Sequence, residues 1–150
     1  MTRPAFIPRD PAFAARVEAS FARQAFMGHL GVALAHVAPG EVDLVVPFQP
    51  GLNQQHGFFH AGVTATIADS AAGYAALSLF SPGTGILTTE FKINLLAPAR
   101  GEKLLARGRV IKPGRTLTVC RSDVAAIGDG EETLIATGLF TLMQVEGLED

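Results

Sequence analysis

The chain is 150 residues long, with 48% hydrophobic and 17% charged residues, which fits one compact domain with a sizeable core. Its formal net charge of -2 excludes the dense basic face that general nucleic-acid binding needs. Cys120 is the only cysteine, so no disulfide can form within the chain, and a reducing cytoplasm fits best.

Residues 1–29 are predicted to form an N-terminal helical segment. Asp10-Pro11 combines an N-cap acid with a proline suited to the first helical position. Apolar side chains then recur every four residues from Phe13 to Phe21, which predicts one amphipathic helix to about Met27. The segment holds no apolar stretch of signal-peptide length, so secretion is not expected.

Residues 30–145 are predicted to form the core of the domain. From Gly31 to Phe48, alternation of apolar and polar residues around Pro39-Gly40 is typical of a β-hairpin. A polar loop over residues 49–57 leads to an apolar helix that starts near Phe59 or His60 and ends before residue 81. Four extended segments follow, at about residues 86–96, 103–112, 115–127 and 131–145, with hairpin turns between the last three.

The central helix is apolar nearly all round, so other elements must cover it on most sides. The economical arrangement is an antiparallel sheet curled around the helix, which predicts a single α+β domain over residues 1–150. The stretch approaches membrane-spanning length, but Asp69 near its middle would cost about 2.5 to 3.5 kcal/mol in hydrocarbon, so no membrane insertion is expected.

Asp69 is the only Asp, Glu, Lys or Arg between Asp43 and Glu90. A carboxylate inside an apolar segment is costly unless partners or a water-filled cleft compensate it. Two explanations are open. Asp69 either works on a substrate, or it hydrogen-bonds a structural element.

Several motifs together resemble those of the hotdog-fold thioesterases, in particular the PaaI-like branch of phenylacetic acid degradation. They are the loop Gly57-Phe-Phe-His-Ala-Gly62, the acid in Ile67-Ala-Asp-Ser70, the strand Thr88–Pro98 and the hairpin over residues 101–124. The resemblance implies an antiparallel sheet wrapped around a long central helix. It also implies an acyl-coenzyme A thioesterase acting on aryl or medium-chain acyl groups, without a cofactor, as a homodimer or homotetramer.

The resemblance assigns roles to individual residues, with two departures from the family pattern. Ala61 stands where the family has a glycine, and its backbone N–H, with or without that of Gly62, is expected to stabilise the oxyanion at a helix N-terminus. Asp69 is expected to be the general base or the nucleophile, and the sequence leaves both roles open. Gln54 stands where many members have an asparagine, and it is expected to support catalysis.

Other residues are assigned to the site with a structural alternative beside each. Thr88 aligns with a hydroxyl that holds the attacking water, although threonine is also a common strand residue. His60 either fixes the entry of the helix or transfers a proton. Asn53, His60, Gly62 and Arg115 are the expected substrate-binding residues. Arg115 lies among Arg107, Arg109, Lys112 and Arg121, which form either a site for the phosphates of coenzyme A or a solvated strand face.

The spacing of Ala61 and Asp69 adds an inference that needs no family. Eight helical residues separate them, or roughly 12 Å along the axis at about 1.5 Å per residue. The two groups therefore cannot reach one carbonyl carbon from the same helix. If they act together, Asp69 comes from a second copy of the chain.

The sequence fits other function classes less well. No zinc motif, phosphate-binding loop, Gly-x-Ser-x-Gly elbow or dinucleotide fingerprint occurs, so cofactor-free chemistry is expected. The leading alternative is a non-catalytic module that binds or senses acyl-coenzyme A on the same fold. A hotdog hydratase or dehydratase ranks third, because the chain lacks an Asp-x-Asn-Pro-x-His-type stretch.

Overall fold

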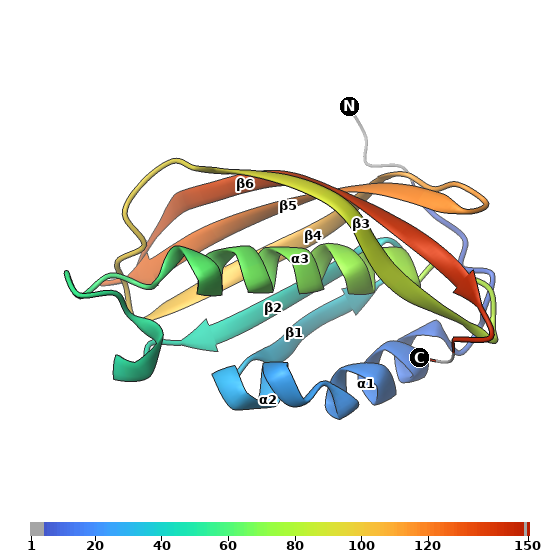
Figure 1. Ribbon diagram of the computed structural model, residues 1–150, viewed down its shortest axis with the longest axis horizontal. Coiled ribbons are helices and arrows are strands. Elements are labelled where there is room, and N and C mark those ends of the chain that lie inside the picture. Colours follow the sequence, from blue (N-terminus) through green and yellow to red (C-terminus); the bar gives the residue numbers. More distant parts are fainter. Residues whose placement is uncertain (1–4, 149) are drawn as a thin grey trace.

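The computed structural model describes residues 5–148 and 150, which form one six-stranded antiparallel sheet with a long helix against one face (Figure 1). The strand order is β1-β2-β4-β5-β6-β3. Residues 1–4 of the predicted N-terminal segment lie outside the described residues. The elements are α1 (Phe13–Arg23), α2 (Ala25–Leu30), β1 (Ala33–Ala38), β2 (Glu41–Pro47), the 3-10 helix η1 (Pro50–Leu52), α3 (Ala61–Leu77), β3 (Thr84–Leu95), β4 (Lys103–Lys112), β5 (Leu117–Gly128) and β6 (Glu131–Glu146).

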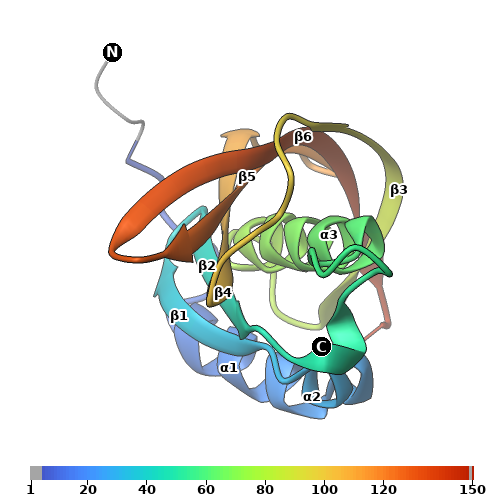
Figure 2. The same cartoon turned by 90° about the vertical axis from the view of Figure 1, so that its left-hand side faces the viewer.

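The sheet curls around α3, as the view along the helix shows (Figure 2). Ile67, Ala71 and Leu77 of α3 are fully buried, because the concave face of the sheet covers them. Gly108 of β4 allows the closest approach, since a Cβ there would meet the carbonyl oxygen of Ala71 at 2.1 Å. The predicted sheet wrapped around a central helix is therefore confirmed. No helix among the described residues is long and apolar enough to cross a membrane.

The prediction of one N-terminal helix to Met27 is wrong, because the structure has two helices that meet at Gln24. The Gln24 backbone is extended, with φ -74° and ψ 96°. In a continuous helix, Leu30 would lie about 140° around the axis from Val17, at 100° per residue. The break instead lets both Val17 and Leu30 be buried, at 0% and 7% exposure.

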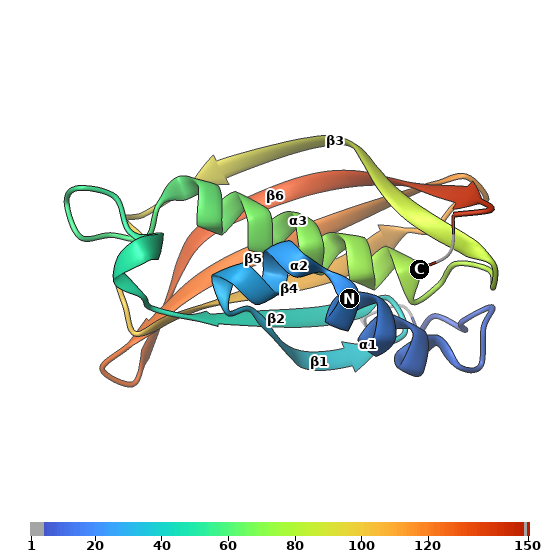
Figure 3. The same cartoon turned by 60° about the horizontal axis from the view of Figure 1, so that its bottom comes forward.

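Arg16 attaches α1 to the end of α3. Its guanidinium donates to the carbonyl oxygens of Leu77, Phe80 and Ser81 at 3.1, 3.3 and 3.0 Å, and to the carboxylate of Asp10 at 3.2 Å. A helix leaves its last carbonyl groups without internal partners, and a cation is the favoured group there. Arg16 therefore satisfies the end of α3 and holds α1 beside its C-terminal half (Figure 3).

Strand β3 forms one edge of the sheet and is 12 residues long. It pairs with β6 on one side, and its other side has no neighbouring strand in the described chain. Apolar side chains are open to solvent along it, with Leu87, Phe91 and Leu95 at 49, 50 and 56% exposure. A long, apolar, unprotected edge is a template for pairing with another strand.

Candidate functional site

The N-terminus of α3 presents one free backbone donor. His60 is the N-cap, and its Nδ1 accepts a hydrogen bond from the Gly62 N–H at 2.8 Å. The Gly62 donor is therefore occupied within the cap. Among the described residues, no hydrogen bond takes up the N–H of Ala61, which is exposed in the first turn. This is the group that the dipole of α3 makes most attractive to a negatively charged oxygen.

A cavity of about 600 Å³ lies over this donor. Gln54 and Ala61 line it together with apolar side chains, including Phe58 and Phe59. The side-chain oxygen of Gln54 accepts a hydrogen bond from the His56 N–H, so its amide nitrogen is the end left for the cavity. The cavity is mostly apolar with a few polar groups, as ligand sites usually are.

Arg100 is a cation near this cavity that the sequence interpretation missed. Its guanidinium lies 5.0 Å from the centroid of the Phe58 ring, whose side chain lines the cavity. The geometry is that of a cation–π contact, which holds a flexible side chain in place. In the sequence, only the position of Arg100 directly after Pro98-Ala99 points to a role at the cavity. Pro98 and Ala99 both line this cavity in the structure.

Asp69 lies two turns further along α3, facing β3. The Thr88 hydroxyl donates to Asp69 Oδ1 at 2.8 Å. Burial raises the pKa of the Asp69 carboxyl above 3.8, and the Thr88 hydrogen bond opposes this rise. A cavity of about 100 Å³ adjoins the carboxyl and is lined by Gln24, Ser70, Gly73, Tyr74, Ile86 and Thr88. Asp69 is thus half-buried beside open space, held by one polar partner.

The chain does not bring Ala61 and Asp69 to one cavity, since the two spaces share no lining residue. Asn53 and Gly62 line a third, groove-like space of about 330 Å³ beside Phe26 and Thr66. His60 lines both this groove and the cavity over Ala61. The structure therefore gathers Gln54, His60 and Ala61 in one half-site, and it gathers Asp69 and Thr88 in another.

Arg115 is separated from both half-sites. It follows β4 in the turn before β5, and Pro113-Gly114 of this turn adjoin Leu79 and Phe80, just beyond the C-terminal end of α3. One chain therefore does not place Arg115 near Ala61.

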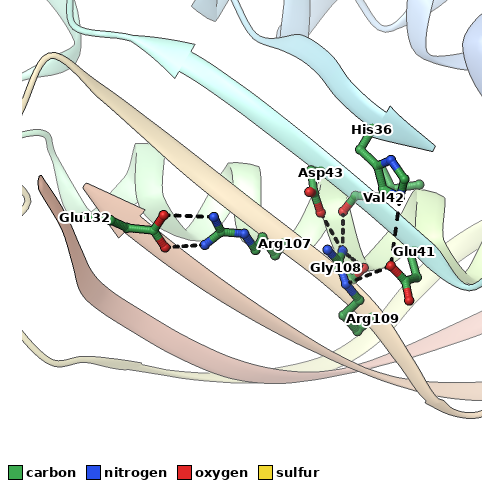
Figure 4. Close-up of polar contacts among 8 residues, drawn as sticks. All are labelled: His36, Glu41, Val42, Asp43, Arg107, Gly108, Arg109 and Glu132. Atoms are coloured by element: carbon green, nitrogen blue, oxygen red, sulfur yellow. Dashed lines mark hydrogen bonds and ion pairs between the residues drawn. The ribbon is translucent and has the colours of Figure 1, made fainter. Parts of the chain in front are cut away.

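The other arginines around this hairpin are paired with carboxylates on the outer face of the sheet, and Figure 4 shows Arg107 and Arg109 with their partners. Arg109 contacts Asp43 at 2.5 Å and Glu41 at 3.4 Å. Arg107 forms a two-pronged ion pair with Glu132, and this hydrogen bonding lowers the pKa of the Glu132 carboxyl. Arg121 pairs with Asp123 at 2.9 Å, so these cations are largely neutralised by acids.

The lone cysteine is unsuited to nucleophilic chemistry. Burial raises the pKa of the Cys120 thiol to about 12, so it carries no thiolate at neutral pH. Within the residues that the structure describes, no three His, Cys, Asp or Glu side chains gather as metal ligands would. Asp69 is left as the strongest candidate for proton transfer or attack.

The chain is similar in sequence and in fold to several known proteins. The family model of the thioesterase superfamily matches residues 56–133. Human acyl-coenzyme A thioesterase 13 is 29% identical over 111 residues, covering 73% of this chain and 77% of that protein. A thioesterase family protein from Silicibacter pomeroyi has 50% identity and a TM-score of 0.89, covering 90% of this chain and 99% of that one. PaaI of E. coli, at 18% identity, shares the fold, with a TM-score of 0.81 and coverage of 90% and 94%.

Proposed function

The chain belongs to the thioesterase superfamily, and we propose that it hydrolyses aryl- or medium-chain acyl-coenzyme A to the free acid and coenzyme A in the cytoplasm. The resemblance to hotdog-fold thioesterases in the sequence is confirmed, and the chain is a hydrolase of thioester bonds. The observation that carries the proposal is the pair of half-sites on α3. One offers a free helix N–H in an apolar cavity, and the other a half-buried carboxyl held by a hydroxyl.

The half-site at Ala61 suits the electrophilic task. Attack on a thioester carbonyl places negative charge on its oxygen, and a fixed donor that meets this oxygen lowers the barrier. The Ala61 N–H supplies that donor, and the amide nitrogen of Gln54 supplies a second polar group in the same cavity. The Gly62 N–H does not take part, because His60 already uses it.

The half-site at Asp69 suits the nucleophilic task in either of two ways. As a base, the carboxylate takes a proton from water while the water oxygen bonds to the carbonyl carbon. As a nucleophile, its own oxygen bonds to that carbon, and water later cleaves the resulting anhydride. In both routes the C–S bond breaks and the thiolate leaves with its electron pair. Thr88 fixes one carboxyl oxygen, so the other is the one left to take the proton or to attack.

The two halves combine if two chains pair about a two-fold axis with their α3 helices antiparallel. The free edge of β3 and its exposed apolar side chains support such pairing. Each dimer then has two sites, with Ala61 from one chain and Asp69 from the other. Further pairing of dimers gives a tetramer, which remains open within this proposal.

Arg100 replaces Arg115 as the first candidate for the phosphates of coenzyme A. It stacks on a side chain that lines the cavity over Ala61, and no ion pair with a carboxylate is found for it among the described residues. A guanidinium held over an aromatic ring keeps its donors available for phosphate oxygens. The nucleotide would then lie at the surface while the acyl thioester enters the cavity.

The decisive experiment measures thiol release from a panel of acyl-coenzyme A substrates. Wild type should release thiol, Asp69→Asn should lose nearly all turnover, and the exposed turn variant Asp129→Asn should match wild type. Asp129 is a fair control because its φ of 52° suits asparagine. Binding of acyl-coenzyme A by wild type with no thiol release would instead favour a non-catalytic binding module.

Sharing of the site between chains has its own test. Two inactive variants, Asp69→Asn and Ala61→Pro, are unfolded together and refolded as a mixture. Random pairing makes about half of the dimers mixed, each with one intact site out of two, so about a quarter of wild-type activity should return. No recovery despite mixed dimers would place both groups in sites within one chain.

A further inference from the structure

Thr64 of α3 carries a buried hydroxyl without a hydrogen-bond partner. The residue is 1% exposed, and among the described residues its Oγ1 finds neither a donor nor an acceptor. Buried polar atoms in proteins nearly always have a partner, and a hydroxyl left unpaired makes folding less favourable. A residue that carries this cost calls for an explanation in function.

The usual acceptor for a threonine hydroxyl in a helix is already engaged here. Such a hydroxyl commonly donates to the carbonyl oxygen four residues earlier, which for Thr64 belongs to His60. The His60 carbonyl oxygen accepts from the Val63 N–H at 2.9 Å and from the Thr64 N–H at 3.4 Å. Both of its lone pairs are therefore in use, and the first turn of α3 leaves the Thr64 hydroxyl free.

Thr64 lines the cavity of about 600 Å³ over Ala61. It follows Ala61 by three residues, so the two lie on the same side of α3 and about 4.5 Å apart along the axis. Side chains in a helix lean towards its N-terminus, so that of Thr64 leans back towards the turn of Ala61. Threonine in a helix divides between two χ1 rotamers, and the hydroxyl can turn to an acceptor that a ligand brings.

The chemistry of an acyl thioester identifies that acceptor. Aryl and medium-chain acyl groups are hydrocarbon beyond the carbonyl, and a sulfur atom is a weak acceptor. The carbonyl oxygen is the strong acceptor, and in the proposed mechanism it already meets the Ala61 N–H. As this oxygen becomes an oxyanion, each hydrogen bond to it becomes shorter and stronger.

We propose that the Thr64 hydroxyl donates a further hydrogen bond to the oxyanion that forms over the Ala61 N–H. The hydroxyl keeps its proton, so no covalent bond forms or breaks at Thr64. The inference rests on the proposed thioesterase function, because it takes the carbonyl oxygen of the substrate as the acceptor. It adds a side-chain donor that the motifs of the sequence did not indicate.

The key variant is Thr64→Val, which replaces the hydroxyl with a methyl group and keeps the branched shape. Its kcat for phenylacetyl- and octanoyl-coenzyme A, measured by thiol release, should fall about ten- to hundredfold. KM should stay within about threefold of wild type, because the oxygen gains its charge only in the transition state. Thr64→Ser keeps the hydroxyl and should retain kcat within about threefold.

The same substitution should raise thermal stability. Water satisfies the Thr64 hydroxyl in the unfolded chain but nothing does so in the fold, so Thr64→Val removes a cost of folding and its Tm should exceed that of wild type. Thr118→Val is the matched control. Thr118 is also 1% exposed, but its hydroxyl accepts from the Gly114 N–H at 3.4 Å, beside residues beyond the C-terminal end of α3. This control should lose Tm and keep kcat.

Three outcomes would overturn the inference. Wild-type kcat in a folded Thr64→Val enzyme would show that the hydroxyl does not meet the oxyanion. A rise in KM at constant kcat would place the hydroxyl on the pantetheine arm of the substrate. Equal losses of Tm and kcat in Thr64→Val and Thr64→Ser would make Thr64 a structural residue.

These outcomes differ from a failure of the proposed function. If wild type releases no thiol from either thioester, the proposed function fails and the oxyanion role of Thr64 fails with it. If wild type is active and Ala61→Pro is impaired while Thr64→Val is not, the function stands and only the role of Thr64 fails.

Discussion

Replacing Ala61 with proline removes one hydrogen-bond donor and little else. Ala61 is the first residue of α3, where the backbone N–H has no partner within the helix and where proline is well tolerated. Proline also restricts the residue before it to extended conformations. His60 already has φ -64° and ψ 139°, so Ala61→Pro should fold with nearly unchanged stability.

The expected effect on catalysis follows from the role of the donor. Loss of one oxyanion donor costs about 2.7 to 4 kcal/mol of transition-state stabilisation, or about 10² to 10³ in kcat. KM should change much less, because the carbonyl oxygen gains most of its negative charge only in the transition state. Ala61→Gly keeps the N–H and should retain kcat within about threefold, since glycine costs at most about 1 kcal/mol in a helix.

The assay is steady-state thiol release at saturating substrate, with thermal unfolding of each variant measured in parallel. Retention of wild-type kcat by a folded Ala61→Pro enzyme would refute the assignment of this N–H to the oxyanion. A large rise in KM at constant kcat would point to blockage of the cavity by the proline ring. Either result would favour the amide of Gln54, another polar group in that cavity, as the oxyanion donor.

Three further predictions concern the Asp69 half-site and the contacts of Arg16 with the end of α3. Thr88→Val removes the hydrogen bond that lowers the pKa of Asp69, so the Asp69 pKa should rise further. The acid limb of the pH profile of kcat/KM should then move to higher pH, and an unchanged acid limb would contradict this prediction. Burial raises the Asp69 pKa above 3.8 in the folded state, so wild type loses stability as pH rises from the unfolded pKa through the folded one. The Tm of Asp69→Asn should therefore exceed that of wild type at pH 7 but not at pH 3. An equal Tm difference at both pH values would show that burial does not act on the charge. Arg16→Ala removes the contacts to the end of α3 and should lower the free energy of unfolding by about 1.5 to 3 kcal/mol in urea titrations. A loss below about 0.5 kcal/mol would show that the Arg16 contacts do not stabilise the fold.

The parts of the fold that sequence reasoning predicted are those with local signals. Pro39-Gly40 and Gly128–Gly130 end their strands by turn chemistry that three or four residues determine. The long apolar stretch after His60 could only be a buried helix, and α3 begins one residue later. These predictions needed no knowledge of which segments meet in space.

The parts that failed depend on contacts between distant segments. Nothing near Gln24 signals a helix break, because the cause is the burial of Leu30 against the folded core. Sequence reasoning left open whether the arginine cluster binds phosphate or forms a solvated strand face, because the acids that pair with it lie on other strands. Asp43 reaches Arg109 only through the pairing of β2 with β4. Arg100 was missed for the same reason, since its partner Phe58 comes from a distant loop.

The spacing on α3 also fixes how two chains would share the sites. Two antiparallel helices related by a two-fold axis bring residue 61 of one chain level with residue 69 of the other only if the axis passes between them at the level of residue 65. That residue is Ala65, and a small side chain at the crossing lets helix axes approach to the lower end of the usual 8 to 10 Å range. A thioester carbonyl lying between the helices could then meet the Ala61 N–H on one side and the partner's Asp69 on the other. A larger residue at position 65 would widen that gap at both sites at once. In this arrangement, packing at position 65 would therefore set the distance between the nucleophile and the oxyanion donor.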